Sequence, residues 1–446
     1  MRTLGSGNDL TTGVVWKKLM GFFFPVLFGL LFQQFYNTAD AVIVGTFIGD
    51  EALAAVGGSA TALTNLVVGF FTGLNSGASV MISQRFGAGD DKGLNKVLHT
   101  AVVFCCAMGL LLSVCGYVFT PAVLRLMGTP EDILDDSALY LRIYLCGAIP
   151  LLMYNLFQGT LQGVGDSKRP LRYLIISCIL NIVLDTLFVA WLKMGVAGVG
   201  IASVISMVVC MLMALVHLMR VDGPHRIRIR DLRVDWLSLK RILKIGLPSG
   251  LQSSLYGISN VIIQSAVNSF GTLAVAAWTA SSKLDGFYWS TSNSFGITIC
   301  AFAGQCYGAG KTDRMKQATH TCMKIALVVT ILLSTLLLLV ARPAYGIFVS
   351  DPGVIDSAVE MMIYIVPTYF VWTFIEVLSG TFRGVGDTFR PMIITMTGTC
   401  GIRVLWMLLV VPVWHTIMAV CLVYGISWVI TAIAFILYYR SGKWLR

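Results

Sequence analysis

The chain has 446 residues, of which 57% are hydrophobic and only 12% are charged. Together with a mean hydropathy of +0.80, this is more apolar surface than a water-soluble core can enclose, which excludes an ordinary soluble protein. The net charge of +10 does not indicate nucleic acid binding, because Lys and Arg cluster at alternate ends of the apolar segments. We therefore expect an integral membrane protein that contacts membrane lipids and no nucleic acid.

A helix that crosses a bilayer needs about 20 mainly apolar residues, and the chain contains twelve such stretches joined by short connections. No small-residue cleavage site follows the first stretch, so we expect that helix to be retained and not removed as a signal peptide. The expected fold is all-α, with twelve transmembrane helices. They begin near Leu19, Leu53, Val97, Ala138, Leu171, Ala197, Ile245, Leu273, Thr319, Ala358, Met392 and Thr416.

The distribution of basic residues predicts the orientation of these helices. Placing the N-terminus, the even-numbered loops and the C-terminus in the cytoplasm puts 25 of the 32 Lys and Arg residues on that side. We therefore expect both termini to be cytoplasmic, in a multi-pass protein of the inner (cytoplasmic) cell membrane. The seven basic residues elsewhere are Arg125, Arg142, Lys193, Lys283, Lys324, Arg342 and Arg403.

Two motifs recur at one offset along the chain. The segment Gly163–Pro170 returns as Gly384–Pro391, and the loop at 84–89 returns at 305–310, each 221 residues later. In the first motif the glycines suit the end of one helix, and the Asp and Pro suit the start of the next, so we expect a tight cytoplasmic corner. Two motifs at a shared offset indicate a duplication.

The duplication divides the chain into two pseudo-symmetric six-helix bundles. We place the first bundle at 1–220, a cytoplasmic linker at 221–243 and the second bundle at 244–446. Because six crossings return the chain to its starting side, both bundles keep the same orientation, and a substrate cavity between them is the expected consequence.

Four carboxylates stand within the predicted spans: Asp40, Asp185, Asp285 and Glu376. A charge inside a bilayer is costly, so each is a candidate for function. No Lys or Arg lies deep in the first six spans, so a proton, a metal ion or a cationic substrate must neutralise Asp40 and Asp185. The alternative is hydrogen bonding between helices that only holds the bundle together.

Amides accompany both aspartates at helical spacing. Gln33 and Asn37 share one face of the first span with Asp40, and Asn181 precedes Asp185 by one turn. Two nearby anions in a poorly hydrated site favour the binding of a proton or a sodium ion. The candidate cation-coupling residues are Asp40, Asp185, Asn181, Asn155 and Asn37, with Asp40, Asn181 and Asp185 as the possible sodium site.

The second half lacks this site, because the repeat places Ile263 opposite Asp40 and Trp406 opposite Asp185. It carries Asp285 and Glu376 instead, with Lys283 and Arg403 in neighbouring spans. These acids and bases either form ion pairs that stabilise the second bundle or leave the acids free to bind the exported molecule.

A polar stripe runs along the seventh span, where Gln252, Tyr256, Asn260, Gln264 and Asn268 stand four residues apart. Such a stripe faces protein or water. Aromatic residues near it could bind flat organic cations through cation–π contact, or they could simply pack between helices. The candidate residues of a substrate cavity are Gln33, Tyr36, Tyr256, Asn260, Gln264, Asp285 and Glu376.

Several of these features occur together in one family. Over essentially its whole length the chain resembles the multidrug and toxic compound extrusion (MATE) family, and it is most similar to the prokaryotic branch whose cation site lies in the first bundle. The features that carry the resemblance are Pro25 and Asp40 in the first span, the Gln84–Gly89 loop, the paired corners, and Asn181 with Asp185 followed by Gly195–Gly198.

The resemblance implies a secondary active antiporter that exports small organic cations in exchange for protons or sodium ions, without a cofactor. It implies roles in ion coupling for Asp40, Asn155, Asn181 and Asp185. Some relatives carry an acidic residue in the seventh span, and this chain has none there. We expect a monomer.

Two alternatives belong to other classes. A lipid or lipid-linked-sugar flippase of the same superfamily would share the helical halves, but we would expect more Lys and Arg in its cavity. An enzyme is not expected, because no H-E-x-x-H or G-x-S-x-G signature is present. Pro25 removes one backbone hydrogen bond from the first span, so it is either a conformational hinge or a proline tolerated near a helix start.

Overall fold

The computed structural model describes residues 9–349 and 351–445. All regular structure in that part of the chain is helical. There are two short π-helical segments: η1 (Thr186–Trp191) continues α7 to its end, and η4 (Met396–Gly401) joins α14 to α15. The α-helices are α1 (Val15–Phe47), α2 (Asp50–Gly57), α3 (Ser59–Gly87), α4 (Asp91–Leu126), α5 (Glu131–Cys146), α6 (Ala148–Gly163), α7 (Lys168–Asp185), α8 (Gly195–Arg220), α9 (Trp236–Asn268), α10 (Thr272–Gly308), α11 (Thr312–Phe348), α12 (Pro352–Ile365), α13 (Tyr369–Val385), α14 (Phe389–Thr395), α15 (Ile402–Leu409) and α16 (Ile417–Arg440).

These helices supply the predicted membrane crossings. Among the described residues, nine helical segments are long and apolar enough to span a bilayer, and α5 with α6, bent by 50°, forms a tenth. The remaining two of the twelve predicted crossings are α9 and α10, which are long enough to cross a bilayer but carry many polar residues. Eleven of the predicted starts lie inside these helices, and Thr416 caps the start of α16.

The chain forms two compact units. The first unit consists mainly of Phe28–Gly250, and the second of Leu10–Leu27 with Leu251–Arg446. Helices α1 and α9 therefore each contribute to both units. In each helix the change comes two residues after a proline, Pro25 or Pro248. The duplication predicts that the first bundle ends at 220 and that the second begins at 244, and these two boundaries stay a prediction.

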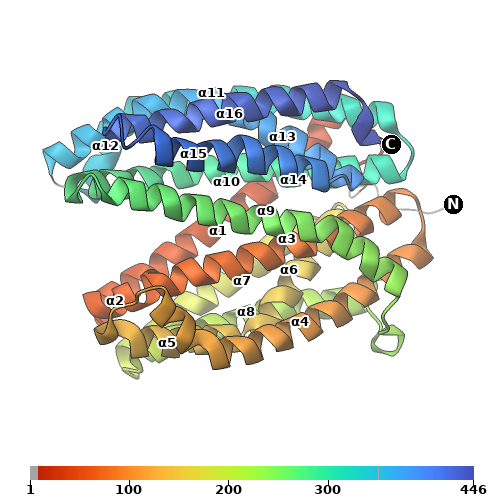
Figure 1. The fold of residues 1–446 in the computed structure, drawn as a ribbon. Helices are drawn as coiled ribbons and strands as arrows, with labels where there is room; N and C mark the ends of the chain where they lie inside the picture. Colours follow the sequence, from red (N-terminus) through yellow and green to blue (C-terminus); the bar gives the residue numbers. More distant parts are fainter. Residues whose placement is uncertain (1–8, 350, 446) are drawn as a thin grey trace. The chain divides into compact units, whose positions relative to one another are not determined.

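Within each unit the helices pack as a bundle (Figure 1). In the first unit α3 packs on α4 and α6, and α8 packs on α5, α6 and α7. In the second unit α10 and α13 form the central pair, with α11, α12 and α16 around them. The same order of pairing in both units follows from the duplication.

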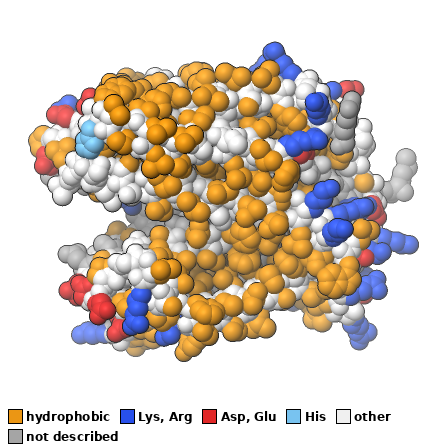
Figure 2. Space-filling model, viewed as in Figure 1, with side chains coloured by type: hydrophobic (Ala, Val, Ile, Leu, Met, Phe, Trp, Pro, Cys, Tyr) orange, Lys and Arg blue, Asp and Glu red, His pale blue; other side chains and the backbone are white. Residues whose placement is uncertain are grey.

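Large apolar side chains remain exposed on the outer faces of the helices. Leu110, Leu111 and Val114 of α4 are more than half exposed, as are Leu332 and Leu336 of α11. On the face drawn in Figure 2, hydrophobic side chains cover the middle of the helices, and Lys and Arg lie toward the helix ends. Such faces are buried by lipid in a membrane protein.

Glycines allow the central helix pairs to approach closely. A Cβ atom at Gly384 of α13 would lie 2.6 Å from the Cys300 carbonyl oxygen of α10, and one at Gly380 would lie 2.6 Å from the Gly296 carbonyl oxygen. In the first unit Gly163 of α6 makes the corresponding close approach to α3. These glycines are part of the repeated pattern, so both copies have kept the same close packing.

The two repeated corners share their backbone turn but differ in their side-chain bonds. Gly165 and Gly386 both have φ of 90°, which glycine adopts without strain. Asp166 accepts hydrogen bonds from the backbone N–H groups of Lys168 and Arg169, so it caps α7 as predicted. The corresponding Asp387 instead accepts a hydrogen bond from the hydroxyl of Tyr438 in α16.

The glycine packing gives a test of the fold. We expect Gly384→Ala to destabilise the protein by about 1–3 kcal/mol, because the added methyl group overlaps the α10 backbone. Gly346→Ala in α11 is the matched control, since a Cβ there would meet no atom within 4 Å and alanine favours a helix. Thermal unfolding in detergent measures both variants, and a loss of similar size in the two would contradict the close approach.

Candidate functional site

Two helices of the first unit carry the polar residues that the sequence singles out. Asp40 lies on α1, and Asn181 and Asp185 occupy the last two turns of α7, directly before η1. The two helices touch near Gly29, where a Cβ atom would lie 3.8 Å from the Leu174 side chain. This contact brings the faces that carry the polar residues together.

The structure joins the two aspartates through one amide. In the orientation that lets Asn181 donate, its amide nitrogen lies 2.8 Å from Asp40 Oδ1 and 3.1 Å from Asp185 Oδ2. Asn181 and Asp185 are fully buried, whereas Asp40 is partly exposed. Asp185 Oδ1 is enclosed and has no hydrogen-bond donor among the described residues.

No basic side chain compensates these two carboxyl groups. None of the ion pairs between described residues includes Asp40 or Asp185. An unpaired carboxylate in a medium of low dielectric is costly, and the two groups also repel each other when both are ionised. The cluster therefore requires a proton or another cation to be stable within a membrane.

Three tyrosines surround the cluster. Tyr36, one turn before Asp40, donates a hydrogen bond to Ser203 Oγ of α8 over 3.2 Å. Tyr140 and Tyr144 of α5 lie close enough to Asp40 to interact with its charge. Sequence reasoning named Tyr36 but missed the other two, although their spacing of four residues on one helix face was a usable signal.

An apolar cluster continues from the polar one toward the next turns of the same helices. Val44 lies one turn after Asp40, and Val189 lies one turn after Asp185. These valines pack with Val196 and Val199 of α8, and all four are buried. The packing separates the carboxyl groups from the helix ends that lie beyond it.

The other predicted coupling residues do not join the cluster. The amide nitrogen of Asn155 donates to the Leu151 carbonyl oxygen of its own helix over 3.0 Å. Asn37 is exposed, as is Gln33 of the predicted substrate cavity, and neither makes a hydrogen bond to Asp40, Asn181 or Asp185 in the described part of the chain.

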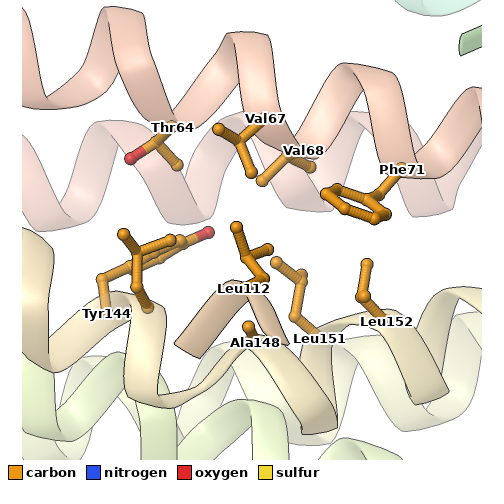
Figure 3. Close-up of a pocket in the computed structure, with 10 residues that line it drawn as sticks. Thr64, Val67, Val68, Phe71, Leu112, Tyr144, Ala148, Leu151 and Leu152 are labelled. Atoms are coloured by element: carbon orange, nitrogen blue, oxygen red, sulfur yellow. The ribbon is translucent and has the colours of Figure 1, made fainter. Parts of the chain in front are cut away.

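An apolar pocket lies in the same unit, between α3 on one side and α4, α5 and α6 on the other (Figure 3). Tyr144 lines this pocket and also lies near Asp40, so the pocket and the polar cluster share a residue. The pocket could not be predicted from the sequence, because its lining residues have the pattern of ordinary apolar packing. The lining residues are Thr64, Val67, Val68, Phe71, Leu112, Tyr144, Leu145, Ala148, Leu151 and Leu152.

The acids of the second unit have partners other than the expected ones. Asp285 Oδ1 accepts a hydrogen bond from the Tyr369 hydroxyl over 2.5 Å. Glu376 lies 3.5 Å from Arg383, two turns later on α13. Of the two alternatives left open by the sequence, an ion pair with Lys283 or Arg403 is not found among the described residues, since Glu376 pairs with Arg383 instead.

The polar stripe of α9 is partly satisfied within its own helix. The Gln264 amide nitrogen donates to Asn268 Oδ1 over 2.9 Å, and Asn260 is exposed. The Tyr256 ring meets the Trp372 ring edge-on, with the centroids 6.1 Å apart. Tyr256 is thus part of an aromatic cluster in the second unit.

Comparison with known proteins agrees with this architecture. The MatE family model matches residues 25–187 and again residues 248–409, one match in each half of the chain. The probable multidrug resistance protein YoeA of Bacillus subtilis is 29% identical over 398 residues, which cover 87% of this chain and 86% of that protein. The probable multidrug resistance protein YpnP of the same organism is 27% identical over 441 residues, with coverage of 98% and 97%.

A solved structure has the same fold. It is described as the outward-facing conformation of a multidrug resistance MATE family transporter of the MOP superfamily, and it matches with a TM-score of 0.89 and 25% identity. The match covers 98% of this chain and 97% of that chain. The predicted all-α membrane fold, with twelve transmembrane helices in two six-helix bundles, is confirmed.

The bridging amide gives a test of the site. We expect Asn181→Ala to lower the free energy of unfolding by about 1–3 kcal/mol, because it removes buried donors that lie between two carboxyl groups. Asn155→Ala is the matched control and should cost less, since that amide bonds only to its own helix. Thermal unfolding of both variants in detergent measures the difference.

A double-mutant cycle with Asp40→Asn completes this test. If Asn181 bridges the acids, its loss should cost less when Asp40 is already neutral, so the two changes should not be additive. Additive losses, or equal losses for Asn181→Ala and Asn155→Ala, would contradict the bridge.

Proposed function

This chain belongs to the MatE family, and from that premise we propose that it is a secondary active multidrug efflux transporter that exports organic cations in exchange for protons or sodium ions. The predicted family is confirmed, and so is the prediction of a transporter and not an enzyme. Relatives named as multidrug resistance proteins support small-molecule drugs as the substrates.

The observation that carries the proposal is the cluster of Asp40, Asn181 and Asp185. Two carboxyl groups share one amide in a buried site without a basic partner. A basic side chain beside the cluster would form a permanent ion pair with it. Without such a side chain, the cluster can bind a cation reversibly. Reversible loading is what coupling to an ion gradient requires.

Asn181 suits either coupling ion. With its amide nitrogen toward the acids it donates to both carboxyl groups, as distances of 2.8 and 3.1 Å allow. With its oxygen toward them it could accept from a protonated carboxyl group or coordinate sodium, which prefers oxygen ligands. The same three side chains can therefore serve a loaded and an unloaded state.

Exchange requires that the ion and the drug favour opposite conformations, because a ligand shifts an equilibrium only by its differential affinity for the two states. The tyrosines near Asp40 offer ring faces to an organic cation, and the carboxyl groups offer charge. We propose that proton or sodium binding removes this charge and thereby releases the drug.

Pro25 is the proposed hinge of α1. It lies inside the helix, two residues before α1 passes from the second unit to the first. Pro248 occupies the corresponding place in α9, which the sequence analysis did not single out. A proline removes a backbone hydrogen bond, so a bend at either position disrupts little further bonding.

The proposed setting is the inner cell membrane with both termini in the cytoplasm. The clustering of Lys and Arg supports this orientation. The lipid or lipid-linked-sugar flippase remains the alternative, but names of relatives support drug export. We propose a monomer as the transporting form.

The carboxyl groups give the direct test. We expect Asp40→Asn and Asp185→Asn each to reduce gradient-driven efflux of a cationic dye to the rate of empty vesicles, because neither amide can be loaded and unloaded with an ion. Asp356→Asn is the control, since Asp356 forms an exposed pair with Arg342 and should leave efflux unchanged. Proteoliposomes with a proton gradient alone or a sodium gradient alone identify the ion. Full efflux by both aspartate variants would refute the proposed site.

Reciprocity between ion and drug gives an independent test. We expect the affinity for a fluorescent organic cation to fall as the coupling ion is added, and the ion's affinity to fall by the same factor when the drug is added. Equilibrium binding to the purified protein, titrated with protons or with sodium, measures both effects. Drug affinity that neither ion changes, in protein shown to transport, would exclude this coupling.

A further inference from the structure

A buried cation in the second unit has no carboxylate partner. Arg403 lies at the start of α15 and is only 4% exposed. No ion pair between described residues includes it. The two carboxylates within the spans of this unit have other partners, because Asp285 accepts from Tyr369 and Glu376 pairs with Arg383. A charged side chain within a membrane span and without a counterion is a candidate for ligand binding.

Three residues of α16 hold the guanidinium group in place. Its carbon lies 4.1 Å from the ring centroid of Tyr424 and 5.6 Å from that of Trp428. Its Nε donates to Ser427 Oγ over 3.3 Å. Cation–π contact stabilises the charge but accepts none of the in-plane N–H groups. The fork of the guanidinium thus remains available.

Two buried donors lie near Arg403 without an acceptor among the described residues. They are the indole nitrogens of Trp372 and Trp428, whose rings lie 5.6 Å apart, and the Trp428 ring contacts the guanidinium group. The hydrogen bond from Nε is the only one found for Arg403 in the described part of the chain, and its terminal nitrogens are not among the fully enclosed polar atoms. Buried donors normally find a partner, so the two unmet indole donors beside this cation indicate a missing acceptor. An anion supplies acceptors and charge together.

The backbone beside Arg403 is also irregular. The π-helical segment η4 ends at Gly401, two residues before Arg403. Single turns of π-helix are frequent at functional sites. This feature is independent of the charge and donor arguments and marks the same place.

We propose that Arg403 binds the carboxylate of a planar aromatic acid or aromatic zwitterion, with Tyr424 and Trp428 lining the site. One guanidinium fork matches the two oxygens of a carboxylate, whereas a phosphate dianion would need further positive charge. The aromatic rings suit a flat ligand body. The proposal goes beyond export of organic cations, because it adds an anionic substrate group and a site in the other unit.

Binding to the purified full-length protein tests the proposal without relying on transport. Isothermal titration calorimetry with 1-naphthoate and with its neutral analogue 1-naphthamide separates charge from aromatic packing. We expect the wild-type protein to prefer the carboxylate. Arg403→Gln should weaken naphthoate binding by about tenfold to a hundredfold, the usual range for a charged hydrogen bond, and should leave naphthamide binding nearly unchanged.

Matched variants sharpen the result. Arg403→Lys should lie between wild type and Arg403→Gln, because lysine keeps the charge but loses the fork. Arg342→Gln is the control, since Arg342 is exposed and paired with Asp356. Asp40→Asn should abolish dye efflux yet retain naphthoate binding, which separates failure of this proposal from failure of the proposed coupling site.

Three outcomes would overturn the proposal. These are no preference of the wild-type protein for naphthoate over naphthamide, equal weakening of both ligands by Arg403→Gln, and unchanged naphthoate affinity in that variant. If Arg403→Gln does not fold, the wild-type preference together with Arg403→Lys decides the question. A wild-type preference for naphthoate that weakens in Arg403→Lys supports the fork, whereas a preference that is absent from the wild-type protein or unchanged in Arg403→Lys refutes it.

Discussion

The repulsion between two neighbouring carboxyl groups, one of them fully buried, is the constraint on which the first unit depends. Asp40 and Asp185 share the single amide of Asn181 and have no basic partner. In a medium of low dielectric, this arrangement is stable only when a cation or a proton is added. The close contact of α1 with α7 and the buried valines beyond them hold the acids together. This need for an added positive charge is the basis of the proposed ion coupling.

The two units come from one repeated sequence, but they bury side chains of opposite charge without an ionic partner. The first unit has acceptors in excess around Asp185, whose Oδ1 lacks a donor. The second has two unmatched indole donors beside Arg403, and its acids are held by Tyr369 and Arg383. Duplication supplied equivalent helices, and substitution then left acids without a basic partner in one unit and a base without an acidic partner in the other.

The sequence predicted those features that depend on local pattern. Apolar length predicts the spans, the 221-residue offset predicts the paired corners, and isolated carboxylates in apolar helices led to Asp40 and Asp185. It did not predict what depends on distance in space. Tyr140 and Tyr144 resemble ordinary packing residues until α5 is placed beside Asp40. Arg383 lies near the end of its helix, and the sequence pattern does not indicate that its long side chain contacts Glu376 two turns earlier.

The division of α1 between the units has a consequence for biosynthesis. Leu10 N donates to Gln305 Oε1, a bond between residues 295 positions apart in the chain. The first part of α1 leaves the ribosome well before its partners in the second unit are made. Residues 10–27 therefore remain without their native contacts until most of the second unit has been synthesised. A nascent chain stopped after α8 would keep this segment without those contacts, and such incompletely packed intermediates are prone to misassembly.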